Sequence, residues 1–501
     1  IAIGHVMSQI TSTHSPPYVN LILSSLAPQK ALNMNKQLVS MHLKPLGKIT
    51  LLFSAVKAVQ FAVIIYTPVQ FDVSSALLLQ NYVHEKAILS TFHTPVPLLN
   101  RILSKSAYFV LDRIVDRLVS WDAVYFADLF ANGIQYEHQY VFCPLWWRLI
   151  RAIPGNRNTN FYSCLLNAVF ITNLCHLAAS VVLYFYTLEV FGKARIFSPS
   201  RMAMATLILY VCSPAAAYLT APYSEAIAAL CSFLCLYLRE VSVGRDQHIV
   251  ASLLKLKNGQ AVRTFENDDV SDHALENEDE TKLKHAPLAN ISTCLYILSG
   301  AFAALAFGFR ANCLFLGLIY VYDICCKKTR TPFLPLAAGL ILGIAFLALQ
   351  LHSYFSVCPS GRGEWCDSKF PSLFAYAQSH YWGNGFFKYW TTNNVANFLF
   401  AAPTIALLGH SVRYFGQTYP VERVLPVLAV NMVFLTLLLL FWHVQIITRI
   451  HTFLPVVYWL VAGLITQPNA RHQRWARVVV TYFVGWNVLQ TALFAAFLPP
   501  A

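Results

Sequence analysis

Long apolar runs recur along most of this 501-residue chain. A helix of about 20 apolar residues is long enough to cross the hydrocarbon core of a bilayer. The runs predict eleven transmembrane helices, at residues 49–66, 162–190, 202–220, 224–241, 289–308, 312–326, 333–355, 393–410, 424–442, 452–467 and 477–497. We therefore expect an all-α polytopic membrane protein whose transmembrane domain spans residues 49–497.

Three polar segments interrupt or precede these runs. Residues 1–48 begin with Ile1, carry no signal-peptide pattern, and are expected to be a cytosolic segment that is disordered or wrongly assigned to this chain. Residues 68–161 form a large loop after the first run. Residues 244–285 hold a dense group of acids, and we expect a disordered cytosolic loop there without a catalytic role.

Composition supports a membrane protein and gives its orientation. With 57% hydrophobic and 12% charged residues, the chain is not an ordinary soluble domain. Its net charge of +13 reflects basic loops rather than a nucleic-acid surface. The positive-inside rule then places the N-terminus in the cytosol and loop 68–161 in the lumen. The basic residues that decide this lie in short loops: Lys44, Lys48, Lys193, Arg195, Arg201, Lys327, Lys328, Arg330, Arg413, Arg471, Arg474 and Arg477.

The stretch Arg113–Trp147 of the luminal loop is polar and rich in aromatic residues. Its apolar positions recur at roughly helical spacing, which predicts a helix lying along the membrane surface. Asp122 would sit at the bilayer edge, where a carboxylate can act as a general acid or base. The alternative is that Asp122 caps or orients that helix. The apolar positions are Ile114, Val115, Leu118, Val119, Phe126, Leu129 and Phe130.

Other polar groups fall at the luminal ends of predicted spans, namely Glu225, Arg310 and Arg449 together with His443 and Gln445. A charge at membrane depth costs at least ~2.5 kcal/mol, so such residues need partners or a function. Pairing between helices without any catalytic role is the competing explanation.

Cysteine and nucleotide signals are few. Cys358 and Cys366 flank a polar loop, and a disulfide between them would imply an oxidising lumen. No Cys/His cluster has zinc-ligand spacing, and the chain contains neither a Walker loop nor a Rossmann glycine fingerprint.

Several short motifs occur in a fixed order along the chain. Upstream they are Trp121-Asp122, then Glu137-x-x-Tyr140-x-Phe142-x-Pro144-Leu145, then Ser213-Pro214-Ala215 with Ala221-Pro222-Tyr223-Ser224-Glu225-Ala226. Downstream they are Tyr381-Trp382-Gly383-Asn384-Gly385-Phe386-Phe387-Lys388-Tyr389-Trp390, Ala401-Ala402-Pro403 and Leu454-Pro455-Val456-Val457-Tyr458-Trp459. The set resembles the PIG-V family of GPI mannosyltransferases, of the fungal type, from about residue 49 to the C-terminus.

The sequence departs from that family pattern at a few places. Ala311 and Cys313 stand where the family tends to have serine and glycine, and Val141 replaces a usual alanine. Gly363-Glu364 precedes Trp365 where Arg-Pro is more typical. These differences weaken residue-level roles for the Cys358–Cys366 loop.

The resemblance implies a GT-C type glycosyltransferase fold in the endoplasmic reticulum membrane, with its active site on the luminal side. It implies dolichyl-phosphate-mannose as donor and a mono-mannosylated GPI intermediate as acceptor, joined by an α-1,6 linkage with inversion. No cofactor is expected, the metal requirement stays open, and a small membrane partner subunit is compatible with the resemblance.

In such a reaction a single carboxylate takes the proton of the acceptor hydroxyl. We expect Asp122 to be this base, with Asp72 second, although Asp72 precedes Ser74 and is as well suited to capping a helix. The leaving phosphate calls for cations, for which Arg310, Arg449 and His443 are candidates. Further substrate-binding candidates are Trp121, Tyr125 and Tyr140, which could stack on sugars, and Glu137, Glu225 and Gln445.

Each of these residues also has a structural explanation. Glu137 could accept hydrogen bonds from backbone or from His138, Glu225 could simply begin a helix, and Trp121 could belong to an interfacial aromatic belt. Two alternative functions stay open, another dolichol-dependent GT-C glycosyltransferase and a polytopic transporter. The absence of an internal repeat and the gathering of polar groups on one side argue against the transporter.

Overall fold

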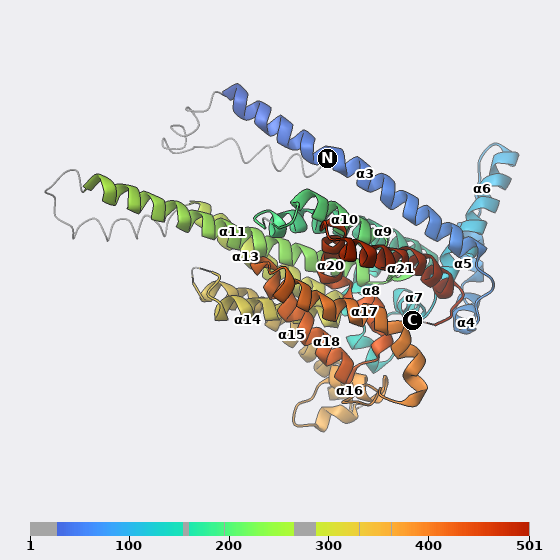
Figure 1. Ribbon diagram of the computed structural model, residues 1–501. Helices are drawn as coiled ribbons and strands as arrows, with labels where there is room; N and C mark the ends of the chain where they lie inside the picture. The colour runs from blue at the N-terminus through green and yellow to red at the C-terminus, as the bar shows by residue number, and fades with distance from the viewer. Residues whose placement is uncertain are drawn as a thin grey trace. The chain divides into compact units, whose positions relative to one another are not determined.

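The computed structural model describes residues 28–153, 160–194, 196–264, 287–329, 331–361 and 363–499 (Figure 1). These residues form helices and connecting turns, and no strand occurs among them. The chain divides into two compact units, residues 1–55 and 56–501. Within the first unit, residues 28–55 belong to helix α3 (Pro28–Tyr66), so residues 28–48 are helical and the rest of the expected N-terminal segment lies outside the described residues.

Eight helices of the described residues are long and apolar enough to cross a membrane, which confirms an all-α membrane fold. They agree with eight of the eleven predicted spans. The helices that supply them are α3, α9 (Phe161–Phe191), α11 (Glu225–Thr264), α13 (Pro287–Phe309), α15 (Phe333–Val357), α17 (Val395–Arg413), α18 (Leu425–Phe441) and α21 (Ala470–Ala495).

The other three predicted spans are short or broken. Span 202–220 is α10 (Pro199–Val211) followed by the 3₁₀ turn η4 (Ala216–Leu219), and span 312–326 is η5 (Ala311–Leu316) with α14 (Gly317–Cys325). Span 452–467 is α20 (Val456–Thr466), bent by 78° from the turns at Val444–Phe453. Pro214 and Pro455 lie at two of these breaks. A proline interrupts a helix because it lacks a backbone N–H donor and its ring clashes with the preceding helical turn. The count of eleven continuous spans is therefore not reproduced.

The apolar part of helix α11, Glu225–Gln247, is the most buried of the eight membrane-spanning segments among the described residues. It packs against α9 and α13, and α13 packs against α15 in turn (Figure 1). α11 also extends to Thr264, well beyond its apolar part, which ends at Gln247. Residues 244–264 of the expected disordered loop are therefore helical, and their leucines and lysines favour a helix. Residues 265–285 lie outside the described residues.

Loop 68–161 contains several short helices. They are α4 (Ser74–Gln80), α5 (Val83–Leu89), α6 (Pro97–Val110), η1 (Leu111–Val115), η2 (Asp116–Leu118), α7 (Asp122–Asn132), η3 (Glu137–Val141) and α8 (Pro144–Ala152). The expected surface helix is wrong at residues 115–130, because Leu118, Val119 and Phe126 are 0% exposed and pack in the main core. α6 instead has no buried residue and projects away from the long helices in Figure 1.

A second loop connects α15 to α17. It holds η6 (Cys358–Ser360), η7 (Glu364–Asp367), α16 (Leu373–His380) and η8 (Thr392–Asn394). The predicted disulfide between Cys358 and Cys366 is confirmed. It flanks a small apolar cluster formed by Val357, Trp365 and Leu373. The remaining short elements are η9 (Tyr414–Thr418), η10 (Glu422–Val424), η11 (Val444–Ile446), α19 (Ile447–Ile450) and η12 (His451–Phe453).

Candidate active site

A cavity of about 350 Å³ opens where the two loops meet the ends of the long helices. We call it the main cavity. Its walls come from the start of α7, the end of η3, η5, α16 and the segment between α18 and α20. The lining residues are Trp121, Asp122, Val141, Phe142, Cys143, Arg310, Ala311, Asn312, Phe374, Gln378, Trp382, Asn384, Trp442, His443, Gln445, Ile446, Arg449 and Ile450.

An unusual turn presents Asp122 to the main cavity. Trp121 has φ 57° and ψ −129°, a conformation that costs free energy for any residue other than glycine. The turn is held on both sides, since the Ser120 hydroxyl accepts a hydrogen bond from Gln70 Nε2 at 3.0 Å and the Ser120 carbonyl accepts one from the Tyr223 hydroxyl at 3.1 Å. α7 then begins at Asp122 itself, where the helix dipole favours a carboxylate.

The Asp122 carboxylate is paired with a cation rather than engaged in capping. Arg449 Nη1 lies 2.7 Å from Asp122 Oδ2, and the Asp122 side chain is 25% exposed. No side-chain hydrogen bond caps α7. The geometry therefore differs from the capping alternative and leaves one carboxylate face toward the main cavity.

Two further charges complete this group. Arg310 Nη2 lies 3.2 Å from Glu225 Oε1, and Arg449 Nε lies 4.0 Å from the same oxygen. We call Asp122, Glu225, Arg310 and Arg449 the cavity cluster. These four residues, predicted from four separate stretches of sequence, are in contact in the structure.

The cavity cluster is balanced in charge but incomplete in hydrogen bonding. Glu225 is 2% exposed, yet neither of its carboxylate oxygens accepts a well-aligned hydrogen bond, and Arg449 Nε donates none. The Arg449 guanidinium also lies over the rings of Tyr218 and Tyr223, at 5.4 and 5.9 Å. Glu225 does not line the main cavity, so its carboxylate acts on the site through the ion pairs with Arg310 and Arg449, which do line it.

Other predicted residues are divided between the main cavity and its surroundings. Trp121, His443 and Gln445 line the main cavity, and the His443 ring stacks on Tyr389 with centroids 4.5 Å apart. Tyr125 does not line it and is 56% exposed.

Glu137 connects loop 68–161 to the loop between α15 and α17 instead of lining the main cavity. Its carboxylate accepts hydrogen bonds from the Tyr381 hydroxyl at 2.6 Å and from Trp365 Nε1 at 3.4 Å. The hydrogen bond from Tyr381 is the main reason why the pKa of Tyr381 is raised to about 12. Glu137 therefore acts as a structural hydrogen-bond acceptor, and its partners are Tyr381 and Trp365 rather than His138.

Asp72 is not among the residues that line the main cavity. Its carboxylate accepts a hydrogen bond from the Ser74 backbone amide at 2.7 Å, and hydrogen bonding by Ser74 lowers the pKa of Asp72. Its contacts are those of a residue that supports the start of α4.

The structure adds lining residues to which the sequence assigned no role. Cys143, Gln378 and Trp442 are among them, and burial raises the pKa of the Cys143 thiol, so this group is a neutral neighbour of Arg310. Asn384 donates to Gln378 and falls within the motif at Tyr381–Trp390, next to Gly383 with φ 61°. That motif was the available signal, but its position in space required the fold.

The described residues contain no group of three His, Cys, Asp or Glu side chains arranged to hold a metal ion. The arrangement can offer one proton-accepting carboxylate and two guanidinium groups to a polar, anionic ligand. These features define an integral membrane protein with a charged, solvent-accessible candidate active site at the ends of its spans.

Comparison with known proteins narrows this class. A sequence model of the family described as "Mannosyltransferase (PIG-V)" matches residues 61–424 and 418–501. GPI mannosyltransferase 2 of Candida albicans is 36% identical over 463 residues, which cover 91% of this chain and 100% of that protein. The Saccharomyces cerevisiae protein of the same name is 30% identical and covers 90% of this chain and 99% of its own.

The chain belongs to the PIG-V mannosyltransferase family and is an integral membrane mannosyltransferase. Among solved structures, the oligosaccharyltransferase of Archaeoglobus fulgidus matches with a TM-score of 0.38 and 13% identity, covering 75% of this chain and 48% of that one.

Proposed function

We propose that this chain is a GPI mannosyltransferase that transfers mannose from dolichyl-phosphate-mannose to a GPI intermediate bearing one mannose. The product carries an α-1,6 linkage and the reaction inverts the anomeric centre. The observation that carries this proposal is the Asp122–Arg449 ion pair at the wall of the main cavity. The names of the curated relatives supply the acceptor class.

The cavity cluster suits a lipid phosphate donor. Arg310 and Arg449 both line the main cavity, and guanidinium groups bind phosphate oxygens through charge-assisted hydrogen bonds. Their contribution rises as the C1–O bond to phosphate breaks, because negative charge then accumulates on the leaving oxygen.

Asp122 supplies the base in this proposal. Its carboxylate removes the proton of the acceptor 6-hydroxyl while that oxygen attacks C1 of the mannose from the face opposite the phosphate. One bond forms and one breaks, the proton goes to Asp122, and dolichyl phosphate leaves with the bonding electrons. Because a β-linked donor gives an α-linked product in one displacement, a single carboxylate is enough.

The same proposal includes a GT-C type fold and a luminal active site in the endoplasmic reticulum. The Cys358–Cys366 disulfide supports an oxidising compartment on the side of the main cavity. The reaction needs no organic cofactor, since the donor is already an activated lipid phosphate. A small membrane partner subunit remains part of the proposal as a requirement to be tested by coexpression.

The test uses microsomes that contain the parent chain, Asp122→Asn or Asp128→Asn, with labelled dolichyl-phosphate-mannose and the mono-mannosylated intermediate. Asp128 lies on the same helix, bonded to Asn132, and serves as the matched control. We expect the parent and Asp128→Asn to add a second mannose, and Asp122→Asn to lose about 10²–10⁴-fold in rate, as removal of a general base does.

Transfer at the parental rate by a folded Asp122→Asn would exclude Asp122 as the base. Transfer to an N-glycan lipid intermediate but not to the GPI intermediate would favour another dolichol-dependent glycosyltransferase. Failure with and without coexpressed partner subunits would reject the proposed acceptor.

A further inference from the structure

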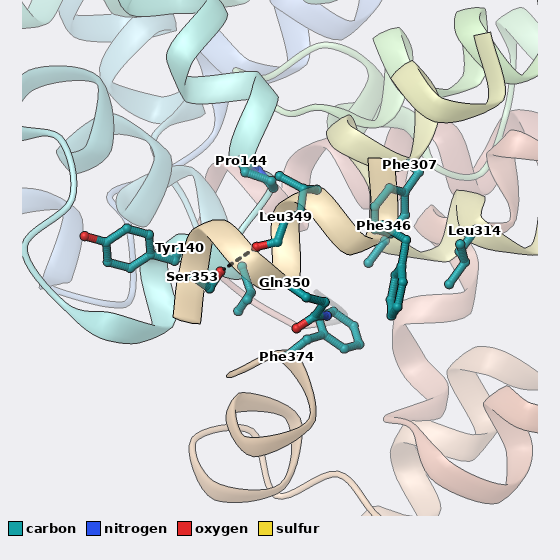
Figure 2. A pocket seen from close by; sticks show the side chains of 11 residues that line it. Tyr140, Pro144, Phe307, Leu314, Phe346, Leu349, Gln350, Ser353 and Phe374 are labelled. Atoms are coloured by element: carbon teal, nitrogen blue, oxygen red, sulfur yellow. Dashed lines mark hydrogen bonds between the residues drawn. The ribbon is translucent and has the colours of Figure 1, made fainter. Parts of the chain in front are cut away.

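A second, smaller cavity of about 60 Å³ adjoins the main cavity. We call it the apolar cavity, and Figure 2 shows its lining side chains. They come from η3, the start of α8, the end of α13, η5, α15 and α16. Val141, Ala311 and Phe374 line both cavities, so the two spaces share a wall.

The side chains that line the apolar cavity present mainly carbon atoms to it. Phe307, Leu314, Phe346 and Leu349 supply four of its side chains. The Ser353 hydroxyl is used within its own helix, where it donates to the Leu349 carbonyl at 3.0 Å (Figure 2).

The remaining polar side chains offer little to a polar ligand. Gln350 Oε1 accepts a hydrogen bond from Ser372 at 3.2 Å. The hydroxyl of Tyr140 points away from the other lining residues in Figure 2. A hydrocarbon group would therefore meet mainly carbon atoms here, as apolar ligands require.

The position of the apolar cavity relative to the charges is fixed by chain connectivity. Arg310 lines the main cavity and bonds ionically to Glu225, and its neighbour Ala311 lines both cavities. Consecutive Cα atoms lie about 3.8 Å apart. Because Val141, Ala311 and Phe374 line both spaces, the esterified group of a phosphate bound in the main cavity can extend toward the apolar cavity.

We propose that the apolar cavity binds the isoprenoid unit of the lipid donor that is attached directly to its phosphate. This inference rests on the proposed function and adds to it a binding site for the lipid. The size agrees, because one water needs roughly 10–15 Å³ of such volume, so this space holds about four water-sized groups. A five-carbon unit is of that order.

The identity of the lipid follows from how far each lipid lies from the reacting atoms. In the donor, the isoprenoid is joined to the phosphate that leaves C1. In the acceptor, inositol phosphate and sugars separate the acyl chains from the reacting hydroxyl. Only the donor can place hydrocarbon directly beside Arg310 while its sugar occupies the main cavity.

The outer face of α15 is suited to contact with a bilayer. Leu351 is 53% exposed and Phe355 is 66% exposed, whereas Ser353 between them is 1% exposed and lines the apolar cavity. One helix therefore separates the apolar cavity from the lipid, and the rest of the donor chain has a short route to the membrane.

The test fills the apolar cavity and compares two donors. Leu349→Trp is assayed in microsomes with dolichyl-phosphate-mannose and with mannosyl methyl phosphate, which has no isoprenoid. We expect the KM for the dolichyl donor to rise about tenfold or more, with the KM for the GPI acceptor and the rate with the methyl donor at parental values.

Leu340→Trp is the matched control, since Leu340 lies on the same helix, is 59% exposed and lines neither cavity. It should leave both donors at parental values. Equal loss with both donors, no loss with either, or a raised KM for the acceptor alone would overturn the proposed lipid site. A parent chain that uses the methyl donor but not the dolichyl donor would overturn the proposed donor and this site together.

A second measurement needs no substitution. A citronellyl-phosphate-mannose analogue with a photoreactive group on its first isoprenoid unit is irradiated with the parent chain in microsomes. Crosslinks within residues 346–353 or 311–314, reduced by excess dolichyl-phosphate-mannose, are expected. Competed crosslinks that fall only elsewhere would contradict the proposal even while mannose transfer by the same preparation upholds the proposed function.

Discussion

Two groups of buried charges lie along helix α11, one at its first residue and one about four turns further on. The cavity cluster gathers around Glu225, and a second group, which we call the end cluster, gathers around Arg239 and Glu240. Glu225 and Arg239 lie about 21 Å apart along the helix, at a rise of 1.5 Å per residue. The end cluster consists of Glu189, Arg239, Glu240, Asp323 and Arg423.

The two clusters differ in how fully they are bonded. In the end cluster, Arg239 donates to both oxygens of Asp323 and, at 2.7 Å, to Glu240. Arg423 adds bonds to Glu189 at 3.0 Å, and Tyr296 donates to Asp323 at 2.5 Å. In the cavity cluster, by contrast, Glu225 accepts no aligned hydrogen bond.

The difference indicates different uses of buried charge. A network in which the charged groups are bonded to one another fixes the mutual positions of helices, here α9, α11, α14 and η10. The cavity cluster instead has one carboxylate and two guanidinium groups on the wall of a cavity, where their charges can act on a ligand. The comparison predicts that changes in the first group alter stability and changes in the second alter catalysis.

The largest difference is expected from one substitution made in both clusters. Arg449→Lys keeps the charge but loses the planar fork that reaches both Asp122 and Glu225, and kcat should fall about 10²-fold or more. Arg239→Lys should leave kcat within about twofold, because it lies outside the active site. Initial-rate kinetics on equal amounts of folded protein check both. Comparable losses of kcat would contradict the division.

Asp323→Asn tests the structural use of the end cluster. Asp323 is fully buried and accepts two hydrogen bonds from Arg239, so Asp323→Asn removes one charged partner of a buried ion pair, at a cost of about 3–5 kcal/mol in the free energy of unfolding. Thermal unfolding in detergent measures this as a lowered Tm. An unchanged Tm with a lower kcat would reverse the assignment of the two clusters.

A smaller effect is expected at Lys57, which supports the unwound segment before α11. Lys57 Nζ donates to the Leu219 carbonyl at 2.9 Å and to Thr220 Oγ1 at 2.6 Å. Lys57→Met should loosen the positions of Tyr218 and Tyr223 beneath Arg449. Because a small misplacement of a group that positions the site lowers the rate, kcat should fall by about tenfold. Partial recovery in Lys57→Arg, measured as kcat, would separate loss of these bonds from general unfolding.

The smallest effect is expected at Asp72, the second candidate base. Since its carboxylate accepts a hydrogen bond from the Ser74 amide and does not line the main cavity, Asp72→Asn should keep kcat within about twofold of the parent. A loss of about 10²-fold or more in Asp72→Asn, with parental activity in Asp122→Asn, would show that Asp72, rather than Asp122, is the base.

Sequence reasoning was most successful where one helix suffices to explain the pattern. Eight apolar runs are continuous helices because an uninterrupted stretch of about 20 apolar residues satisfies its backbone within itself and its side chains in lipid. It was least successful at the breaks near Pro214 and Pro455, where irregular backbone is tolerated because neighbouring helices bury it.

The candidate site shows the same limit. The sequence singled out Asp122, Glu225, Arg310 and Arg449 individually, because charges near a membrane need a partner or a function. It could not show that they pair with one another, nor that residues 115–130 pack inside the core, since an apolar stripe fits a protein core as well as a membrane surface.

The sequence by itself therefore determined the membrane class, most of the spans, the family and the charged residues of the site. These depend on local hydrophobicity and on short motifs. The tertiary structure alone decided which charges meet, that Glu137 bonds across two loops, and that an apolar cavity adjoins the charged one. Those features depend on contacts between segments hundreds of residues apart, such as Asp122 with Arg449, and no local pattern encodes such distances.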